Sequence, residues 1–503
     1  MSLNLITDSW IPVLRDGEHT VIRPDQIAEP GVGALAWQRA DFNLACLELL
    51  IGLVSMADPP KDEADWLSRL GRTDAERFRE ALAPFAPCFA LDGDGPRFLQ
   101  DMEAFELVAK PSDIKPVDML HIDSAGGSTT SKNADLMVKR DRFPTLSPAE
   151  AAMALYTLQA FAPAGGAGNR TSMRGGGPMV TLVRPLDEKS ERFSLWRLVF
   201  ANVLPGAPLA AEDAEAALPW LRPTRTSENG QIVTQEGTHS LEAFFGMPRR
   251  LRFVFKEERV VGVVQRSYGT NYAAWEHPLT PYYRKKEDDP EWLPVHPRAG
   301  RLSYRNWLGL TMEPAGDGKA TRRTARAVRE CRSHFRGPDF ELVVGGWAMD
   351  NMKPLDFLLD QYPAFPGLGE DEVDRVRQLV EAANAATSAL RKALRTACQF
   401  DGKFADAVIE TFFAETEGEF IAAVRRIIDS AGTEVEEAWH RTLRKQAVRM
   451  FDERALGGLI DHDIKGIEAR VIARSKLLGM LAKQVRKLLD LPVPAKKKKE
   501  KQA

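Results

Sequence analysis

The stretch Pro163-Ala-Gly-Gly-Ala-Gly-Asn-Arg-Thr-Ser-Met-Arg-Gly-Gly-Gly-Pro178 stands between a predicted helix and a predicted strand. The helix is expected to run from Ser147 to about Phe161, because Ser147-Pro-Ala-Glu150 has the residues of a helix start. The strand is expected over 179–183. This order, helix before and strand after, is the reverse of a dinucleotide-binding turn, and a P-loop lysine is missing. The stretch therefore lacks the standard nucleotide-binding motifs.

Glycine is unusually dense in this stretch. Six of the 37 glycines of the chain fall within 165–177, with Arg170 and Arg174 among them. Glycine lets a backbone take positive φ and approach a ligand closely. No Asp or Glu occurs over 151–186, where about five would be expected from 71 acidic residues in 503. Two interpretations stay open: a loop that presses backbone amides onto an anionic ligand, or a long flexible connection.

Composition limits the class of protein. A chain of 503 residues is expected to form two or three domains, and its net charge of −3 means that any nucleic-acid contact must be local. The apolar stretch 42–56 contains Glu48 and predicts a buried helix, not a membrane span. With no visible signal peptide, we expect a cytoplasmic protein. The scattered cysteines and histidines predict no metal site, and we expect no cofactor.

The order of predicted elements changes near residue 370. Strands are predicted over 251–255, 260–264 and 340–344 in a mixed region, and four long helices follow. We expect an α+β chain with a large mixed α/β domain over 1–365, an antiparallel four-helix bundle over 366–490 and a disordered basic tail over 491–503. The expected helices cover 370–399, 404–430, 433–455 and 463–490.

Four segments are predicted to offer polar or basic groups to a nucleic acid. Three are loops: 121–142, 163–177 and 265–272. The fourth follows the strand over 340–344, which we expect to end at Gly345-Gly346 and to turn, exposing Asn351, Met352 and Lys353. An ordinary strand-turn-helix connection with Trp347 in the core is an equally good interpretation. No catalytic motif is evident, so we expect a protein that is not an enzyme.

Several motifs, taken in order along the chain, resemble the CasA family, the large subunit of the type I-E CRISPR surveillance complex Cascade. The resemblance covers essentially the whole chain when the predicted helical domain is included. The motifs are Asn4-Leu-Ile-Thr-Asp-Ser-Trp-Ile-Pro-Val13, the helix beginning near Asp41 and ending in Ala57-Asp-Pro-Pro60, Met173-Arg-Gly-Gly-Gly-Pro-Met-Val-Thr-Leu-Val183, Trp275-Glu-His-Pro278 and Val344-Gly-Gly-Trp347.

The resemblance implies a non-catalytic role in antiviral defence. Such a subunit recognises the PAM, the short motif beside a double-stranded DNA target, from the minor groove. It helps to unwind the target for R-loop formation with the CRISPR RNA, and it recruits a helicase-nuclease. The implied partners are the small subunit and backbone subunits of Cascade, the CRISPR RNA, the target DNA and the helicase-nuclease, with no membrane.

The resemblance also implies site residues in this sequence. The loop that touches the PAM falls on Gly165, Gly166, Ala167, Gly168 and Asn169. A basic finger falls on Arg266, and the wedge that splits the first base pairs falls on Asp350, Asn351 and Met352. The loop linking PAM sensing to the guide RNA falls on Lys132 and Asn133. Some family members carry a cysteine-rich zinc site before the finger; here 240–275 contains no cysteine.

Two other functions remain open at this point. One is a phosphate- or nucleotide-binding enzyme that uses the same glycine-rich loop. The other is a helical scaffold whose bundle only mediates assembly.

Overall fold

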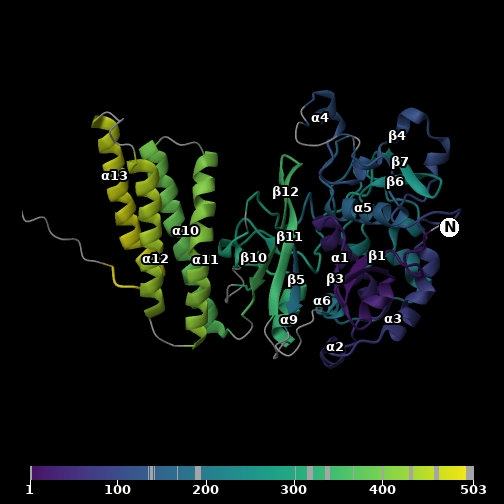
Figure 1. Cartoon of the computed structure of the whole chain (residues 1–503), viewed down its shortest axis with the longest axis horizontal. Helices are drawn as coiled ribbons and strands as arrows, with labels where there is room; N and C mark the ends of the chain where they lie inside the picture. The colour runs from purple at the N-terminus through teal and green to yellow at the C-terminus, as the bar shows by residue number, and fades with distance from the viewer. Residues whose placement is uncertain are drawn as a thin grey trace, which may run out of the picture. The chain divides into compact units, whose positions relative to one another are not determined.

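In the computed structural model of the chain, the residues form two compact units: Met1–Ala299 with Thr324–Pro366, and Gly300–Arg323 with Gly367–Ala503. Figure 1 shows strands and helices together in the first unit and long helices in the second. The structure describes residues 3–133, 135, 140, 142–166, 168–186, 194–300, 302–313, 321–334, 340–365, 368–398, 402–429, 434–457 and 464–493. The expected basic tail therefore lies outside the described residues beyond position 493.

Small antiparallel sheets make up the strand content of the first unit. Three sheets have the orders β2-β1-β3, β4-β7-β6 and β12-β11-β5, and β8 pairs with β9. The strands are β1 (Ile11–Arg15), β2 (Glu18–Ile22), β3 (Val32–Leu35), β4 (Ile114–Lys115), β5 (Val180–Pro185), β6 (Arg250–Lys256), β7 (Arg259–Arg266), β8 (Tyr282–Tyr283), β9 (Leu293–Pro294), β11 (Phe340–Asp350) and β12 (Lys353–Pro363).

Two apolar helices occupy the core of this unit. α1 and α5 pack against each other, and nearly all of their side chains are buried. A helix that is apolar on every side must be buried on every side. The helices of the unit are α1 (Ala40–Ala57), α2 (Glu63–Leu70), α3 (Ala75–Leu82), α4 (Gly127–Ser131), α5 (Pro148–Phe161), α6 (Leu195–Phe200), α7 (Ala214–Ala217), α8 (Glu242–Phe245) and α9 (Arg326–His334).

The predicted buried helix is α1. By length and composition alone it could cross a membrane, but 83% of that stretch is buried inside the protein, so it is a core helix. The predicted start of α5 is also confirmed: the Ser147 hydroxyl accepts from the Glu150 amide, and the Glu150 carboxylate accepts from the Ser147 amide at 2.9 Å. This capping box holds the helix that leads into the glycine-rich stretch.

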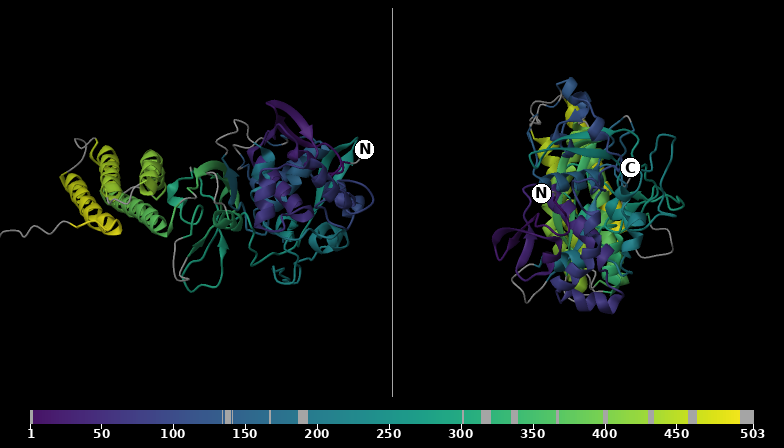
Figure 2. Two further views of the ribbon diagram at one scale, coloured as in Figure 1. Left: turned by 90° about the horizontal axis from the view of Figure 1, so that it is seen from below. Right: turned by 90° about the vertical axis from the view of Figure 1, so that its right-hand side faces the viewer.

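The second unit is a helical bundle, as predicted. Helices α10 to α13 pack together, and their long runs are visible in Figure 2. Tyr304 and Trp307, from the earlier segment Gly300–Arg323 of this unit, contact Phe420 of α11, with ring centroids 4.3 and 5.2 Å away. The elements are β10 (Arg322–Arg323), α10 (Glu370–Cys398), α11 (Gly402–Asp429), α12 (Glu434–Phe451), α13 (Ile464–Met480) and α14 (Arg486–Leu488).

Candidate nucleic-acid interface

The glycine-rich stretch forms a closed turn between α5 and β5. The Gly165 amide donates to the Asn169 carbonyl at 3.1 Å, and the Asn169 amide donates to the Gly166 carbonyl at 2.8 Å. Gly166 has a φ of +66°, and a Cβ added there would meet no atom within 4 Å. The turn, here called the glycine loop (165–169), therefore presents bare backbone to open space at Gly166. Ala167, which we predicted in this loop, lies outside the described residues.

A second segment supports the other side of the glycine loop. Gly168 has a φ of +74°, and its carbonyl accepts from the Tyr268 amide at 3.0 Å. A Cβ on Gly168 would stand 2.8 Å from the Tyr268 amide nitrogen and ring, so a larger residue cannot fit without displacing Tyr268. The Tyr268 side chain stays 41% exposed beside the loop. The structure thus brings the predicted segment 265–272 against the predicted segment 163–177.

The two arginines of the glycine-rich stretch have different surroundings. Arg170 donates from Nε to the Ser227 hydroxyl at 2.8 Å, and that hydroxyl donates to the Gly269 carbonyl at 2.7 Å. Arg174 is buried and forms an ion pair with Glu48 of α1 at 2.6 Å. Arg174 therefore holds the end of the stretch in the core, and its charge is compensated there.

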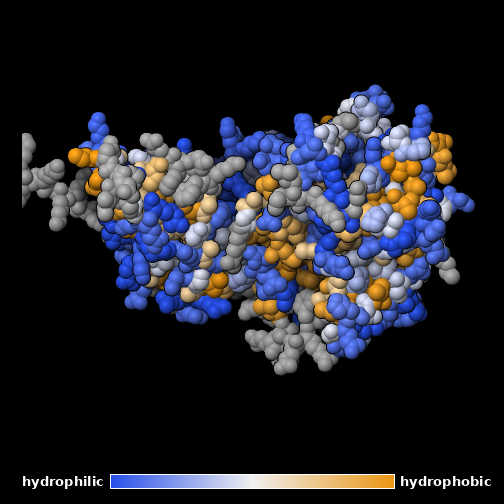
Figure 3. Space-filling view, turned by 45° about the horizontal axis from the view of Figure 1, so that its top comes forward, coloured by the Kyte–Doolittle hydropathy of each residue, from blue (hydrophilic) through white to orange (hydrophobic). Residues whose placement is uncertain are grey.

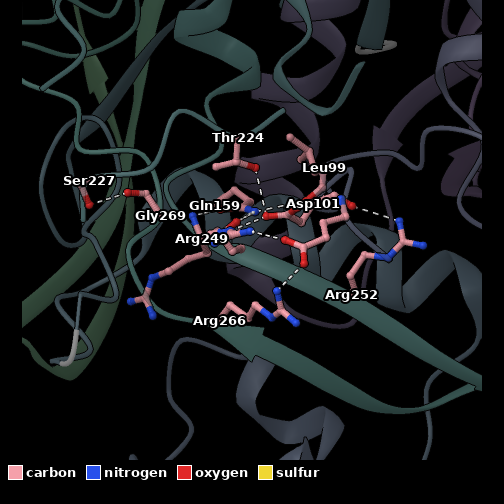
Figure 4. Close-up of polar contacts among 11 residues, drawn as sticks. Leu99, Asp101, Gln159, Thr224, Ser227, Arg249, Arg252, Arg266 and Gly269 are labelled. Carbon is pink, nitrogen blue, oxygen red and sulfur yellow. Dashed lines mark hydrogen bonds and ion pairs between the residues drawn. The ribbon is translucent and has the colours of Figure 1, made fainter. Parts of the chain in front are cut away.

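Arg249 fastens both ends of the glycine loop. Its Nε donates to the Arg170 carbonyl at 2.7 Å, and its Nη2 donates to the Pro163 carbonyl. Its own backbone amide donates to Gln159 Oε1 at 3.0 Å, and Gln159 returns a bond to the Arg249 carbonyl at 3.1 Å. Figure 4 shows Arg249 and Gln159 side by side in this network. Arg249 was not predicted as a site residue, because nothing in the local sequence links it to residues 79 or more positions away.

The predicted turn after Gly345-Gly346 is wrong. The strand β11 continues through both glycines to Asp350 and pairs with β12 along its length. A Cβ on Gly345 would stand 2.8 Å from Leu44, and one on Gly346 would stand 3.0 Å from Pro297, so these glycines serve close packing. The turn lies at Asn351 and Met352, and the connection is strand-turn-strand, with Trp347 buried as expected for a core position.

The hairpin tip, residues 350–353, is a tight two-residue turn. Asn351 and Met352 have φ values of +49° and +62°, the pattern of a type I′ turn, and Asp350 pairs with Lys353. The side-chain Nδ2 of Asn351 donates to the Asp350 carboxylate at 3.0 Å, and Met352 is 45% exposed. The three residues predicted as a wedge therefore lie together at the exposed end of a long hairpin.

The hairpin tip packs against the glycine-rich stretch. A Cβ on Gly176 would stand 3.0 Å from Met352 Sδ and 3.0 Å from Pro163 Cα. A Cβ on Gly177 would collide with the Trp347 carbonyl. The bare glycines thus let β11 and its tip approach the base of the glycine loop. Contacts between segments far apart in the sequence thus bring the glycine loop, Tyr268 and the hairpin tip near one another.

Arg266 points away from the glycine loop in this structure. Its Nη1 lies 2.5 Å from Glu103 Oε1, and its guanidinium lies 4.6 Å from the centre of the Phe105 ring. Figure 4 shows Arg266 on the Asp101 side of this network. The side chain is 40% exposed, so solvent screens the ion pair and the two charges can separate at small cost. The residue of this segment that meets the glycine loop is Tyr268.

The predicted exposed loop over 121–142 contains a short helix, α4, which the sequence analysis missed. Lys132 is exposed directly after α4. Asn133 follows with a φ of +50°, and its side-chain oxygen accepts from Arg140 Nη2 at 3.0 Å. The sequence did not predict this helix, because it consists of Gly, Ser and Thr residues, which have weak helix propensity. Lys132 and Asn133 follow each other in the chain, and no hydrogen bond or ion pair joins them to the glycine loop within the described residues.

Ion pairs surround a buried histidine, His121, where the loop over 121–142 begins and ends. Asp123 pairs with Arg142 at 3.0 Å and with Arg39 at 3.0 Å. Burial acts to raise the pKa of Asp123, but Arg142 and Arg39 outweigh it and lower that pKa to about 2. His121 lies between the rings of Phe42 and Phe143, at 5.8 and 4.4 Å between centroids.

The buried histidine predicts acid sensitivity of this unit. Burial, and then the Arg39 charge, lower the pKa of His121 from 6.5 to about 4, so the unfolded chain takes up a proton between these values and the folded chain does not. The contribution of neutral His121 to the free energy of unfolding is therefore complete above pH 6.5 and decreases as the pH falls towards 4. We expect His121→Phe to remove about 2 kcal/mol of the loss in unfolding free energy between pH 7 and pH 5. Denaturant titrations at both pH values measure it. His19→Phe, which replaces an exposed histidine, is the control. Equal pH dependence of the wild type and His121→Phe would show that His121 is not the source of the acid sensitivity.

A second basic region lies in the bundle. Arg474 and Arg486 are paired with Asp452 and Glu437, each at 2.7 Å. A groove with about 360 Å³ of space between α10 and α13 is lined by lysines and small or polar residues. These lining residues are Lys392, Ala393, Thr396, Ala473, Lys476, Gly479, Met480, Lys483 and Gln484.

The surface around the glycine loop carries groups that can contact a ligand. It offers the bare backbone at Gly166, the ring of Tyr268 and the guanidinium groups of Arg170 and Arg249. Within the described residues no group of three or more His, Cys, Asp or Glu could hold a metal ion. Figure 3 shows a mostly hydrophilic face with separate apolar patches, and the exposed apolar side chains include Met352, Leu355 and Leu359 of the hairpin. Donors and cations of this kind suit a polyanion with acceptor groups.

Comparisons with known proteins agree on one family. A family model described as CRISPR-associated protein Cse1 matches residues 4–450. The fold is similar to that of CasA from Thermus thermophilus, with a TM-score of 0.71 and 17% identity over 96% of this chain and 99% of that chain. It is also similar to Cse1 from Thermobifida fusca, with a TM-score of 0.67 and 17% identity over 97% and 98%. A chain of a solved CRISPR RNA-guided surveillance complex gives a TM-score of 0.68 and 16% identity over 95% and 99%.

Proposed function

The chain belongs to the Cse1 (CasA) family, the family of the large subunit of the CRISPR surveillance complex Cascade, and from this premise we propose that it reads the PAM of double-stranded DNA. In this proposal it is a non-catalytic cytoplasmic subunit that opens the target beside the PAM for pairing with the CRISPR RNA. It then recruits a helicase-nuclease and contacts the small and backbone subunits. The observation that carries the proposal is that the fold brings the glycine loop, Tyr268 and the hairpin tip near one another.

The glycine loop (165–169) is suited to a minor groove. Gly166 has open space where a side chain would stand, so the backbone can enter a groove about 6 Å wide. The minor groove distinguishes pairs chiefly by the extra amino group of guanine. A close backbone excludes that group by contact, which gives tolerant recognition. Asn169 closes the loop through its backbone, and its side-chain oxygen is buried.

The hairpin tip is suited to opening base pairs. Asp350, Asn351 and Met352 stand at the end of the paired strands β11 and β12, near the base of the glycine loop. An exposed apolar side chain such as Met352 can enter between base steps, and unstacking one step costs a few kcal/mol. We propose that groove binding by the glycine loop holds the duplex while the tip enters the adjacent step.

The remaining residues have supporting roles in this proposal. Arg266 contacts the DNA backbone after exchanging Glu103 for a phosphate, which its exposed ion pair allows. Lys132 and Asn133 contact the guide RNA, with Arg140 holding the Asn133 amide. A near-neutral chain with local cations suits a protein that must leave most of the DNA it meets, because affinity for nonspecific DNA rises with each phosphate neutralised.

Binding of a randomised library tests the proposed function. The chain is assembled with the other subunits and a guide RNA, and target duplexes with random flanking bases are selected by binding. The proposal requires enrichment of a small set of flanks that depends on this chain. Equal binding of all flanks by the complete complex would refute it.

Replacement of Asn351 tests the wedge. Asn351→Gly keeps a residue that tolerates the left-handed backbone at this turn and removes only the side chain. We expect strand opening to slow by about tenfold, with initial duplex capture unchanged, because the tip acts after the groove is bound. A fluorescent base beside the PAM reports opening in stopped flow, and a duplex that cannot open reports capture. Equal effects on both steps would show that Asn351 is not part of a wedge.

A further inference from the structure

Arg249 differs from the other buried arginines. Four arginines are among the buried described residues: Arg69, Arg174, Arg249 and Arg252. Three of them face a carboxylate, namely Arg69 with Asp58, Arg174 with Glu48 and Arg252 with Glu106. Arg249 bonds to backbone carbonyls and forms no ion pair within the described part of the chain. A buried cation normally pairs with a carboxylate, so the surroundings of Arg249 are unusual.

The charge of Arg249 is retained at neutral pH. Burial lowers its pKa to about 10, which still leaves the guanidinium protonated in nearly every molecule at pH 7. The carboxylates on the neighbouring segment belong to other arginines: Asp101 lies 2.6 Å from Arg250, and Glu103 lies 2.5 Å from Arg266. The side chain of Arg249 contacts Pro163, Gly165 and Arg170, which belong to the acid-free sequence 151–186. The guanidinium is therefore an uncompensated positive charge under the glycine loop.

One nitrogen of Arg249 remains available. Nε and Nη2 are used by the two carbonyls that close the loop, whereas Nη1 has no hydrogen bond within the described residues. Nη1 is also not fully buried, so solvent reaches it. A Cβ on Gly165 would stand 2.8 Å from Nη1. Only a glycine at position 165 leaves this donor uncovered.

We propose that Arg249 is a phosphate-binding residue at the floor of the glycine loop, where Nη1 donates to a phosphodiester oxygen of DNA lying across Gly165. This inference rests on the proposed function. The two bonds to the loop carbonyls fix the guanidinium before DNA arrives, so little side-chain entropy is lost on binding. The low local dielectric strengthens the attraction to a phosphate. A phosphate supplies the counter-charge that the free chain lacks.

A contact to phosphate has a signature that a contact to a base lacks. Each phosphate neutralised contributes about 0.9 to the slope of log affinity against log salt, and it contributes equally for every sequence. We therefore expect Arg249→Gln in the reconstituted complex to weaken binding of a fixed target about tenfold or more, since a charged hydrogen bond is lost. The salt slope should fall by about one, and the ranking of flanking sequences should stay the same. Affinity is measured across a range of roughly 50 to 200 mM salt.

Two variants separate charge from structure. Arg249→Lys keeps the charge and loses the fork of donors, so its salt slope should match the wild type even if the loop is less well held. Arg252→Gln, in the same strand, removes the same charge from the chain but from a residue paired with Glu106 at 2.6 Å. Its salt slope should also match the wild type. Thermal unfolding of each variant shows whether the chain remains folded.

The outcomes are distinct. A wild-type slope for Arg249→Gln overturns the inference, and so does a changed flank preference with the slope kept, which would assign Arg249 to base recognition. A reduced slope for Arg249→Lys equal to that of Arg249→Gln also overturns it, because the effect would then come from loop structure. If the wild-type complex has no flank preference, the proposed function fails as well. If the wild-type complex has a flank preference but Arg249→Gln has the wild-type salt slope, the proposed function stands and only the inference about Arg249 fails.

Discussion

Gly166→Phe is expected to abolish PAM-dependent DNA binding, with a loss of roughly 100-fold or more in affinity for a preferred target. The reason is steric. Gly166 faces open space in the protein, so the new side chain would project from the loop into the volume that the DNA groove must occupy. Specific contacts would be lost together, and binding would approach the nonspecific level. Equilibrium binding by the reconstituted complex measures the effect, and assembly with the other subunits should be unchanged.

A matched control separates this effect from backbone strain. Gly17 also has positive φ, +89°, and a Cβ added there would meet nothing within 4 Å. Gly17→Phe therefore introduces a similar strain and a similar exposed ring in the β1–β2 turn, and we expect DNA binding to be unaffected. Gly168 is a poor test, because any side chain there displaces Tyr268. Normal PAM-dependent binding by Gly166→Phe would remove the glycine loop from the interface.

Glu48→Leu is expected to destabilise the first unit by about 3–5 kcal/mol. The side chains of Glu48 and Arg174 are 1% and 2% exposed, and their ion pair measures 2.6 Å. Arg174 also donates to Thr280 at 3.2 Å and to the Ala160 carbonyl at 3.3 Å. Loss of the carboxylate leaves a buried cation without a counter-charge at the base of the glycine-rich stretch. Denaturant unfolding of the full chain measures the change, with the bundle transition as the internal reference.

The double variant tests this explanation. Replacing both partners, Glu48→Leu with Arg174→Met, removes the unpaired charge and fills the site with apolar groups of similar volume. We expect most of the lost stability to return, because a buried ion pair and a packed apolar pair are often close in free energy. Additive losses in the double variant would show that the pair acts through packing alone.

Local sequence patterns were sufficient for the elements. The capping box at Ser147, the apolar helix around Glu48 and the four helices after residue 370 were predicted because each depends on residues within one or two turns. The position of the glycine-rich stretch between α5 and β5 followed from the same patterns. The turn predicted at Gly345-Gly346 was wrong. A glycine pair is typical of a turn in the local sequence, but here it permits close packing inside a strand.

The arrangement of the surface required the folded chain. Tyr268 lies against Gly168, Met352 lies against Gly176, and Arg249 lies beneath Gly165. The paired residues are between 84 and 176 positions apart in the sequence, and no periodicity or motif encodes such a distance. The pairing of Arg174 with Glu48, and of Arg266 with Glu103, likewise decides which charges reach the surface. Side-chain type and spacing are local properties of a sequence, whereas exposure and charge compensation depend on packing between distant segments.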